Sequence, residues 1–412
     1  MIVGVRRSLL VLFVVLVAGC AAPAAKRAST PDPLILISID GFRADYLDRG
    51  LTPALTALAA SGVRADALKP SFPTLTFPNH YTLVTGLYPD HHGIVDNRMK
   101  DPATGEIFLY KDSKSIADPA WWGGEPLWAG VENSGRHAAT MFWPGTNVAI
   151  GGVRPSHWLE FDGKLSPDER VDRLLAWFDL PGSSKPAFYT LYLEQVDHEG
   201  HEGGPDSTAV NAALREVDAA LARLVDGLEQ RGAFARTNLV VVSDHGMTST
   251  SPDRVVYLDD LVRVEDAGIV TSGILAGMNP PPDHMAQIER ALLVKHDHMR
   301  CRRRRELPAR FHYGTNPRVP ALLCLADDGW MVSTRESMKN RTHFSLGEHG
   351  YDSDDPAMRA LFVAHGPAFK SGVRVREFEN VDVYPLLAHL LALPPRKVDG
   401  RYEDVSEMLV DP

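Results

Sequence analysis

The segment LILISID, Leu34 to Asp40, is a short and continuous apolar run that ends in a carboxylate. A strand buried on both faces has this pattern, because neither of its faces is polar. AFYTLYLEQVD (187–197) and NLVVVSDH (238–245) repeat the pattern, and ALFVAHG (360–366) is a further apolar run without the acid. We therefore expect strands of a sheet that is covered on both sides.

Helical segments separate these runs. The clearest is Thr208 to Gln230, where apolar residues recur at helical spacing. Strands alternating with helices predict an α/β fold with a largely parallel central sheet flanked by helices. Ligands of such sheets bind beyond the carboxyl ends of the strands, so we expect Asp40, Asp197 and Asp244 to converge on one edge.

The stretch SFPTLTFPNHYTLVTGLYPDHHGIVDN, Ser71 to Asn97, places Thr76 between two prolines and at the expected start of a helix. A hydroxyl there lies in a field that favours negative charge, which suits a nucleophile. Thr74 is a second hydroxyl in the same stretch. From the residues alone, either threonine could be a nucleophile or a helix cap.

Asp and His recur in patterns that suit metal ligation. Asp197 and His201 lie four residues apart in DHEGHEGGP, which we interpret as a loop because of its glycines. Asp244 and His245 are adjacent after an apolar run, and Gly246 permits the turn that would let both bind one ion. Carboxylate and imidazole groups are ligands that zinc accepts. The sequence therefore indicates a metal centre.

TFPNHYTLVTGLYP followed by HGIVDN resembles the signature of the nucleotide pyrophosphatase/phosphodiesterase family of the alkaline phosphatase superfamily. SIDGFR, MFWPGT, VDHEGH, VVSDHGM and GEHGYDS continue the resemblance in family order across nearly all of the chain after residue 33. The resemblance implies an alkaline-phosphatase-like fold. We interpret residues of about 283–334 as a small α/β insertion, with a helix from Asp283 to His296.

The resemblance also implies two zinc ions, with other divalent metals as alternatives. It assigns Asp197, His201 and His349 to the first ion, and Asp40, Thr76, Asp244 and His245 to the second. Thr76 is implied as the nucleophile that forms a covalent phospho-threonine. Asn97 is implied to donate a hydrogen bond to a phosphoryl oxygen, and the backbone amide of Thr76 or Phe77 is a second expected donor.

Residues implied to bind a nucleobase are Phe77, Trp143 and Phe161, the first and last as an aromatic clamp. The expected reaction is hydrolysis of nucleotide phosphodiester or phosphoanhydride bonds with release of a nucleoside monophosphate. A phosphodiesterase acting on lysophospholipids and a lipoprotein that binds its ligand without turnover are the alternatives. Asn147 stands where several relatives carry Asp, and Leu75 where some carry Lys.

The first residues have the pattern of an export signal. Arg6 and Arg7 precede an apolar run from Leu9 to Val17, and the sequence ending in Cys20 resembles a bacterial lipobox. We expect a signal peptide (1–19), a lipidated Cys20, a flexible tether (20–33) and a catalytic domain (34–412). This predicts a periplasmic protein anchored to the membrane, while a plain secretory signal with an incidental cysteine is the alternative.

Composition limits the partners. The 412 residues carry a formal charge of −10, which argues against a general nucleic-acid binder that works through a basic face, and the resemblance implies small nucleotides as the ligands. The basic run from Arg300 to Arg305 is expected to be a solvated loop or helix end. Export permits a disulfide between Cys301 and Cys324, but sequence spacing cannot establish its geometry.

Overall fold

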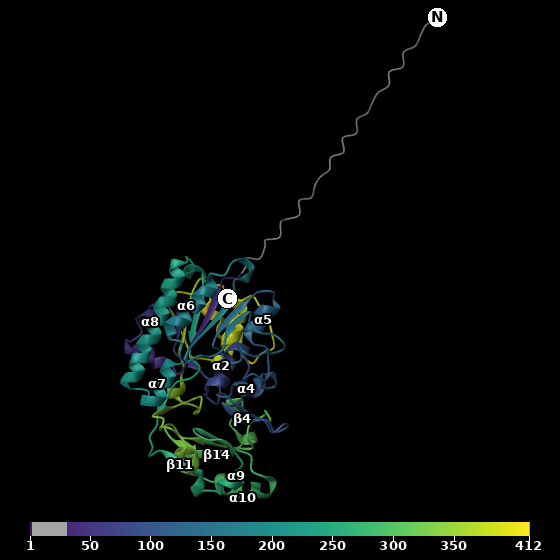
Figure 1. The fold of residues 1–412 in the computed structure, drawn as a ribbon, viewed down its shortest axis with the longest axis vertical. Helices are drawn as coiled ribbons and strands as arrows, with labels where there is room; N and C mark the ends of the chain where they lie inside the picture. Colours follow the sequence, from purple (N-terminus) through teal and green to yellow (C-terminus); the bar gives the residue numbers. More distant parts are fainter. Residues whose placement is uncertain (2–30, 412) are drawn as a thin grey trace. The chain divides into compact units, whose positions relative to one another are not determined.

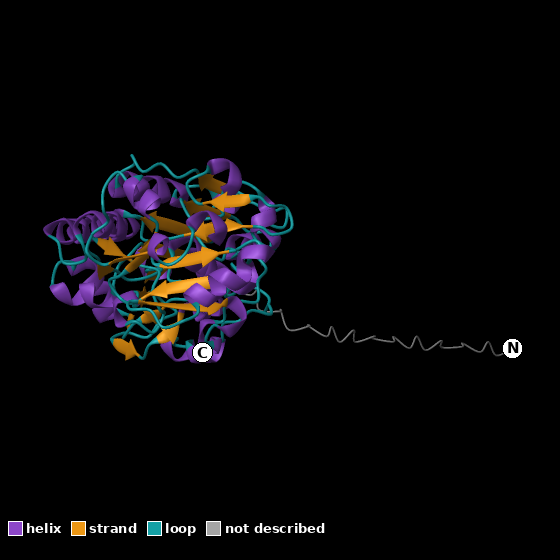
Figure 2. Ribbon diagram, turned by 90° about the horizontal axis from the view of Figure 1, so that it is seen from below, coloured by secondary structure: helices purple, strands orange, loops and turns teal. Residues whose placement is uncertain are grey.

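A central sheet of eight strands organises the fold, in the order β19-β2-β18-β9-β1-β8-β6-β7. The computed structural model describes residues 31–411 together with Met1, so the predicted signal peptide and Cys20 lie outside the described residues. β1 pairs in parallel with both β8 and β9, and only β18 runs antiparallel to its neighbours. The predicted largely parallel sheet is confirmed (Figures 1 and 2). Its strands are β1 Leu34–Ile39, β2 Val63–Ala65, β6 Ala138–Met141, β7 His157–Leu159, β8 Phe188–Leu193, β9 Asn238–Val242, β18 Phe362–His365 and β19 Val373–Val375.

Helices cover both faces of this sheet, as the residues of β1 show. Ile35, Ile37 and Ile39 belong to one buried cluster, whereas Leu34 and Leu36 belong to another, because successive side chains of a strand point to opposite faces. The first cluster includes residues of α1 Pro53–Ser61, α6 Pro167–Phe178 and α8 Thr208–Gln230. The second includes residues of α2 Thr76–Thr85, α5 Leu127–Asn133 and α12 Val383–Leu390.

The segment DHEGHEGGP is helical, so its interpretation as a loop was wrong. Helix α7 spans Gln195–Gly203 and directly follows β8. Gly200 does not break this helix. It packs closely against Met247, since a Cβ added to Gly200 would lie 2.8 Å from Met247 Cε. Asp197 and His201 consequently lie one helical turn apart on the same side.

A second, antiparallel sheet has the order β12-β13-β15-β14, with strands Ile269–Thr271, Leu275–Met278, Leu322–Ala326 and Met299–Arg303. Together with α10 Pro282–Leu292 it encloses a buried cluster of its own. The sheet begins at Ile269, before the predicted 283, and α10 ends four residues before the predicted His296. Arg300 to Arg303 of the basic run belong to strand β14 and pair with the apolar strand β15, so the expectation of a loop or helix end was wrong for them, while Arg304 and Arg305 lie in a short 3-10 helix.

Cys301 of β14 lies directly opposite Cys324 of β15, and the two form a disulfide. Within residues 31–411, no helix is long and apolar enough to cross a bilayer. Shorter elements complete the chain near the site: β4 Arg98–Lys100 with β5 Ile107–Leu109, β10 Thr248–Ser249 with β17 Gly347–Glu348, α3 Pro89–His92 and α4 Ser113–Ile116.

Candidate metal and catalytic centre

The carboxyl ends of three neighbouring strands bring the predicted ligands together. Asp40 follows β1, Asp244 and His245 follow β9, and α7 after β8 carries Asp197 and His201. His245 Nε2 lies 2.9 Å from Asp244 Oδ2 and 3.4 Å from Asp40 Oδ1. Asp197 Oδ2 lies 3.4 Å from His201 Nε2, and its Oδ1 lies 3.6 Å from Nε2 of His349, which follows β17. All six side chains therefore share one edge of the sheet.

Two sets of these side chains offer ligand atoms within 4.8 Å of one another: Asp40 with Asp244 and His245, and Asp197 with His245 and His349. The set of Asp40, Asp244 and His245 agrees with the ligands expected for the second ion. In the other set His245 stands where His201 was expected, because the rings of His245 and His349 stack with their centroids 3.5 Å apart. His245 thus lies between the two groups.

Each histidine is oriented by a backbone carbonyl. Nδ1 lies 2.8 Å from Gly347 O in His201, 3.0 Å from Gly246 O in His245 and 2.9 Å from Thr74 O in His349. A carbonyl oxygen only accepts, so these contacts assign the proton to Nδ1 of each ring. The lone pair of each Nε2 then faces the carboxylates, which is the tautomer a metal-binding histidine needs.

The carboxylates fit a cation as well. Asp40 Oδ1, Asp197 Oδ1 and Asp244 Oδ2 are inaccessible and have no hydrogen-bond partner, which is costly for charged oxygens. Burial raises the pKa of the Asp40 carboxyl well above its ordinary value, and repulsion from Asp244 adds to this shift. A bound divalent cation would lower the pKa of the Asp40 carboxyl again, because it stabilises the charged form. The oxygen and imidazole donors suit zinc.

Tyr192 is a site residue that the sequence interpretation missed. Its hydroxyl donates to Asp40 Oδ2 at 2.6 Å. Tyr192 of β8 pairs in register with Ser38 of β1, and neighbours in a parallel sheet point to the same face. Asp40 lies two residues beyond Ser38, so the strand alternation was the signal that could have identified Tyr192.

Thr74 and Thr76, the two candidate nucleophiles, have different surroundings. Thr76 is the first residue of α2, and its Oγ1 lies 3.3 Å from His245 Nε2. Thr74 is fully buried, and its hydroxyl accepts from Gly350 N at 2.9 Å and donates to Tyr351 O at 3.1 Å. The hydroxyl of Thr74 is therefore occupied in holding two segments together, whereas that of Thr76 faces the metal-ligand cluster.

Asn97 lies beside the first turn of α2. Its Oδ1 accepts the N–H of Phe77 at 3.0 Å, so of the two backbone amides expected as donors to a phosphoryl group, that of Phe77 is occupied and that of Thr76 is left. Among the described residues the side-chain nitrogen of Asn97 has no hydrogen-bond partner, and Asn97 lines the cleft above Thr76. An amide donor is thus available beside the hydroxyl of Thr76.

The cleft that contains these groups has a volume of about 610 Å³. Phe77, Trp143 and Phe161 all line it, together with Asn147. Phe161 is 57% exposed, and its ring lies edge-on to Phe142 with the centroids 5.4 Å apart. Trp143 is buried and donates from Nε1 to His80 O at 3.0 Å, so it forms part of the cleft wall rather than a mobile clamp.

The sequence matches a family model described as type I phosphodiesterase/nucleotide pyrophosphatase over residues 34–352. A Schizosaccharomyces pombe protein named as an uncharacterized pyrophosphatase/phosphodiesterase is 38% identical, over 90% of this chain and 79% of that protein. Ectonucleotide pyrophosphatase/phosphodiesterase family member 3 of Bos taurus is 37% identical, over 92% of this chain. This chain spans only 44% of the length of that bovine relative.

Solved structures of similar fold include murine ectonucleotide pyrophosphatase/phosphodiesterase 5, among them an inactive threonine-to-alanine variant in complex with AMP. The similarity to that complex has a TM-score of 0.87 at 33% identity, covering 92% of this chain and 100% of the murine chain. The human counterpart aligns with the same TM-score of 0.87 at 32% identity.

Proposed function

The chain belongs to the type I phosphodiesterase/nucleotide pyrophosphatase family, and from this premise we propose that it hydrolyses nucleotide phosphodiester or phosphoanhydride bonds to release nucleoside 5′-monophosphates. One observation carries the proposal. The Thr76 hydroxyl, at a helix N-terminus, lies 3.3 Å from His245 in a cluster in which three buried carboxylate oxygens have no hydrogen-bond partner. This arrangement combines a nucleophile with a cation centre.

The chain would hold two divalent ions, for which zinc is our proposal. Asp197, His201 and His349 would hold one ion, and Asp40, Thr76, Asp244 and His245 the other. Bound ions would supply Lewis acidity and positive charge for displacement at phosphorus. His245, which lies between the two sets of ligands, would fix their separation, and Tyr192 would orient Asp40 through its hydrogen bond.

The residues of the cleft would act in two steps. Deprotonated Thr76 Oγ1 attacks phosphorus, the bond to the leaving oxygen breaks, and a phospho-threonine diester forms. Water then attacks the same phosphorus and displaces Thr76, so that one water molecule is consumed and the nucleoside monophosphate leaves. The side-chain nitrogen of Asn97 donates to a phosphoryl oxygen as charge develops there.

The nucleoside would occupy the aromatic end of the cleft. Phe77 and Phe161 both line the cleft and offer aromatic rings that can stack on a base. The AMP complex of the murine relative supports a nucleotide as the ligand of such a cleft.

The test combines metal content with substrate preference. We expect about two zinc ions per chain by mass spectrometry, loss of activity on chelation, and recovery on adding zinc. Steady-state rates for a nucleotide diester, a phosphate monoester, a sulfate ester and a lysophospholipid should be highest for the diester. A preference for the lysophospholipid would replace nucleotides as the substrate class, and metal-free protein with full activity would overturn the proposed centre.

A further inference from the structure

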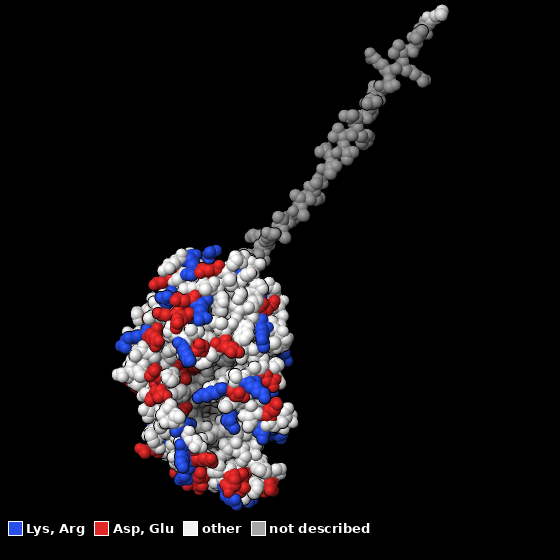
Figure 3. Space-filling view, viewed as in Figure 1, with Lys and Arg blue, Asp and Glu red and all other residues white. Residues whose placement is uncertain are grey.

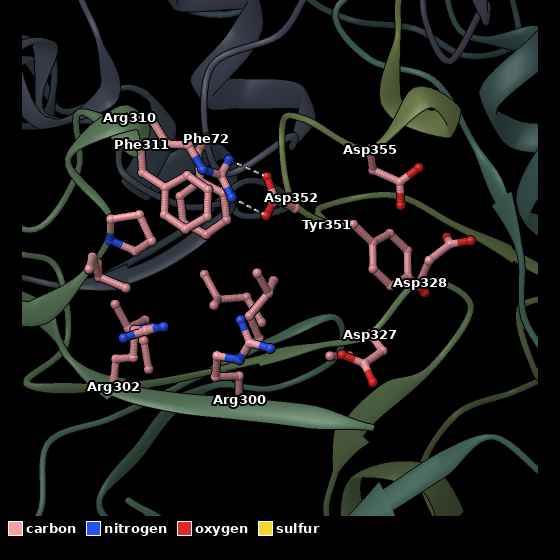
Figure 4. Close-up of a pocket in the computed structure, with 16 residues that line it drawn as sticks. Phe72, Arg300, Arg302, Arg310, Phe311, Asp327, Asp328, Tyr351, Asp352 and Asp355 are labelled. Atoms are coloured by element: carbon pink, nitrogen blue, oxygen red, sulfur yellow. Dashed lines mark hydrogen bonds and ion pairs between the residues drawn. The ribbon is translucent and has the colours of Figure 1, made fainter. Parts of the chain in front are cut away.

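A second cavity lies between the small antiparallel sheet and the segments around 307–311 and 351–355 (Figure 4). It has a volume of about 210 Å³ and shares no lining residue with the catalytic cleft. One wall is a single face of the sheet. Arg300 lies opposite Leu325, and Arg302 opposite Leu323, so all four side chains point to the same side.

The two arginines of this wall differ from their neighbour on the strand. Arg303 points to the other face, where it pairs with Glu289 at 2.7 Å and Glu306 at 2.8 Å. Within the described part of the chain, Arg300 and Arg302 have neither an ion pair nor a side-chain hydrogen bond. Arg300 is exposed and Arg302 half-buried, and among the described residues neither guanidinium group has a carboxylate oxygen within 4.0 Å, although such groups bind phosphate and carboxylate well.

The opposite walls limit what can enter. Arg310 is occupied by Asp352, with its Nη1 2.6 Å from Oδ1, and by Asp354 at 2.7 Å. Figure 4 shows the aspartates 327, 328 and 355 on the side of the cavity away from Arg302. Asp355 caps Ala357 N, and Asp327 lies 3.9 Å from His298. These carboxylates would repel a second anionic group, so a ligand should carry its charge at one end only.

We propose that this cavity binds a small phosphate monoester with an uncharged aromatic or apolar body. Its phosphate would lie between Arg300 and Arg302, and its body would cover Leu323 and Leu325, with the aromatic pair Phe72 and Phe311 at the far end. Those two rings stack with their centroids 4.0 Å apart, which gives the cavity a flat apolar wall.

The site is separate from the catalytic centre but borders it. Phe72 precedes the turn that carries Thr76, and Tyr351 lies two residues after His349. The two segments are joined by the hydrogen bonds of Thr74 to Gly350 and Tyr351. A ligand in the cavity would thus contact the back of both segments without entering the cleft.

Isothermal titration of the full chain with phenyl phosphate tests the proposal. The zinc centre could also bind this probe, so the titration is run with and without a chelator. We expect one binding event per chain to persist after chelation. In the Arg300→Gln/Arg302→Gln variant that remaining event should weaken by at least about tenfold, the effect of losing charge-assisted hydrogen bonds worth 1.4 kcal/mol or more.

Arg305→Gln is the matched control, because Arg305 is an exposed member of the same basic run and does not line the cavity. It should bind the probe as the native protein does. The proposal is overturned if the chelated native protein does not bind phenyl phosphate, or if the double variant, with an unchanged unfolding midpoint, binds it equally well. If Arg305→Gln lowers the affinity for phenyl phosphate as much as the double variant does, the probe is attracted by the basic run as a whole and not bound in the cavity, which would also overturn the proposal.

Discussion

Thr76 and Thr74 are two residues apart, yet their contacts predict opposite consequences of substitution. Thr76→Ala removes the hydroxyl that lies 3.3 Å from Nε2 of His245. We expect turnover of a chromogenic nucleotide diester to fall by a factor on the order of 10³ or more, as for other nucleophiles. The unfolding midpoint and the zinc content should change little, because the six Asp and His ligands remain.

Thr74→Ala is the control for that measurement. It leaves Gly350 N without its buried partner, so it should lower the free energy of unfolding by about 1–3 kcal/mol. The Thr74 variant keeps the Thr76 hydroxyl, so it should still hydrolyse the nucleotide diester. An inactive Thr74 variant of native stability beside an active Thr76 variant would reverse the assignment of the nucleophile.

Phe161 provides a test of substrate selectivity. Its ring is largely exposed in the cleft, so replacing it by alanine should disturb the fold little. If Phe161 stacks on a base, Phe161→Ala should raise KM for a nucleotide diester by an amount equivalent to about 1–3 kcal/mol. The KM of a small diester that lacks a base should stay the same. A similar rise in KM for both substrates would show that the ring shapes the cleft without binding a base.

Asp96 makes the stability of the protein depend on pH. Burial raises the pKa of this carboxyl to about 7, whereas it is about 4 in an unfolded chain. The folded state therefore holds a proton that the unfolded state loses, and the free energy of unfolding falls as pH rises from about 4 to 7, by at most about 4 kcal/mol.

Asp96→Asn removes this titration and keeps Oδ1, which accepts the N–H of Arg98. Denaturant unfolding of the two proteins between pH 4 and pH 8 should show the variant gaining stability relative to the native protein as pH rises. Two parallel curves would mean that Asp96 is charged in the folded protein throughout this range.

At the level of elements, the strands were predictable and the local details of the site were not. Continuous apolar runs identify buried strands, and the rule that ligands gather at their carboxyl ends was enough to bring Asp40, Asp197 and Asp244 together. α7 escaped prediction, because two glycines argue for a loop unless the contact of Gly200 with Met247 is known. The shared position of His245 depends on side-chain stacking, which spacing along the chain does not encode.

The disulfide between β14 and β15 joins residues 23 positions apart. Closing a loop of this length restricts the unfolded chain and can stabilise the folded protein by about 3 kcal/mol. We expect Cys301→Ser/Cys324→Ser to lower the free energy of unfolding by up to that amount while leaving kcat unchanged, because neither cysteine lines the cleft. Reducing the native protein should have the same effect. Unchanged stability after verified reduction would contradict this expectation.

For the whole molecule, surface charge and the distribution of site residues indicate its partners. Figure 3 shows acidic and basic side chains mixed over the visible face, without an extended basic area. With a net charge of −10, this surface does not favour a nucleic acid. Every proposed ligand, the nucleophile and the aromatic cleft lie within the compact unit Pro31–Pro412. No residue of the proposed catalytic centre lies before Pro31.

We expect a chain that begins at Pro31 to be soluble and to hydrolyse nucleotide diesters with kcat/KM within about twofold of the full-length protein, since all the proposed metal ligands, Thr76 and the cleft residues follow Pro31 in the sequence. The lipobox-like sequence further predicts that Cys20→Ser moves the full-length protein from the membrane fraction to a soluble or unprocessed form. Both proteins would be fractionated and assayed together. An inactive chain from Pro31 would show that earlier residues contribute to the fold, and a Cys20→Ser protein still firmly in the membrane would show that the apolar segment Leu9 to Val17 is itself the anchor.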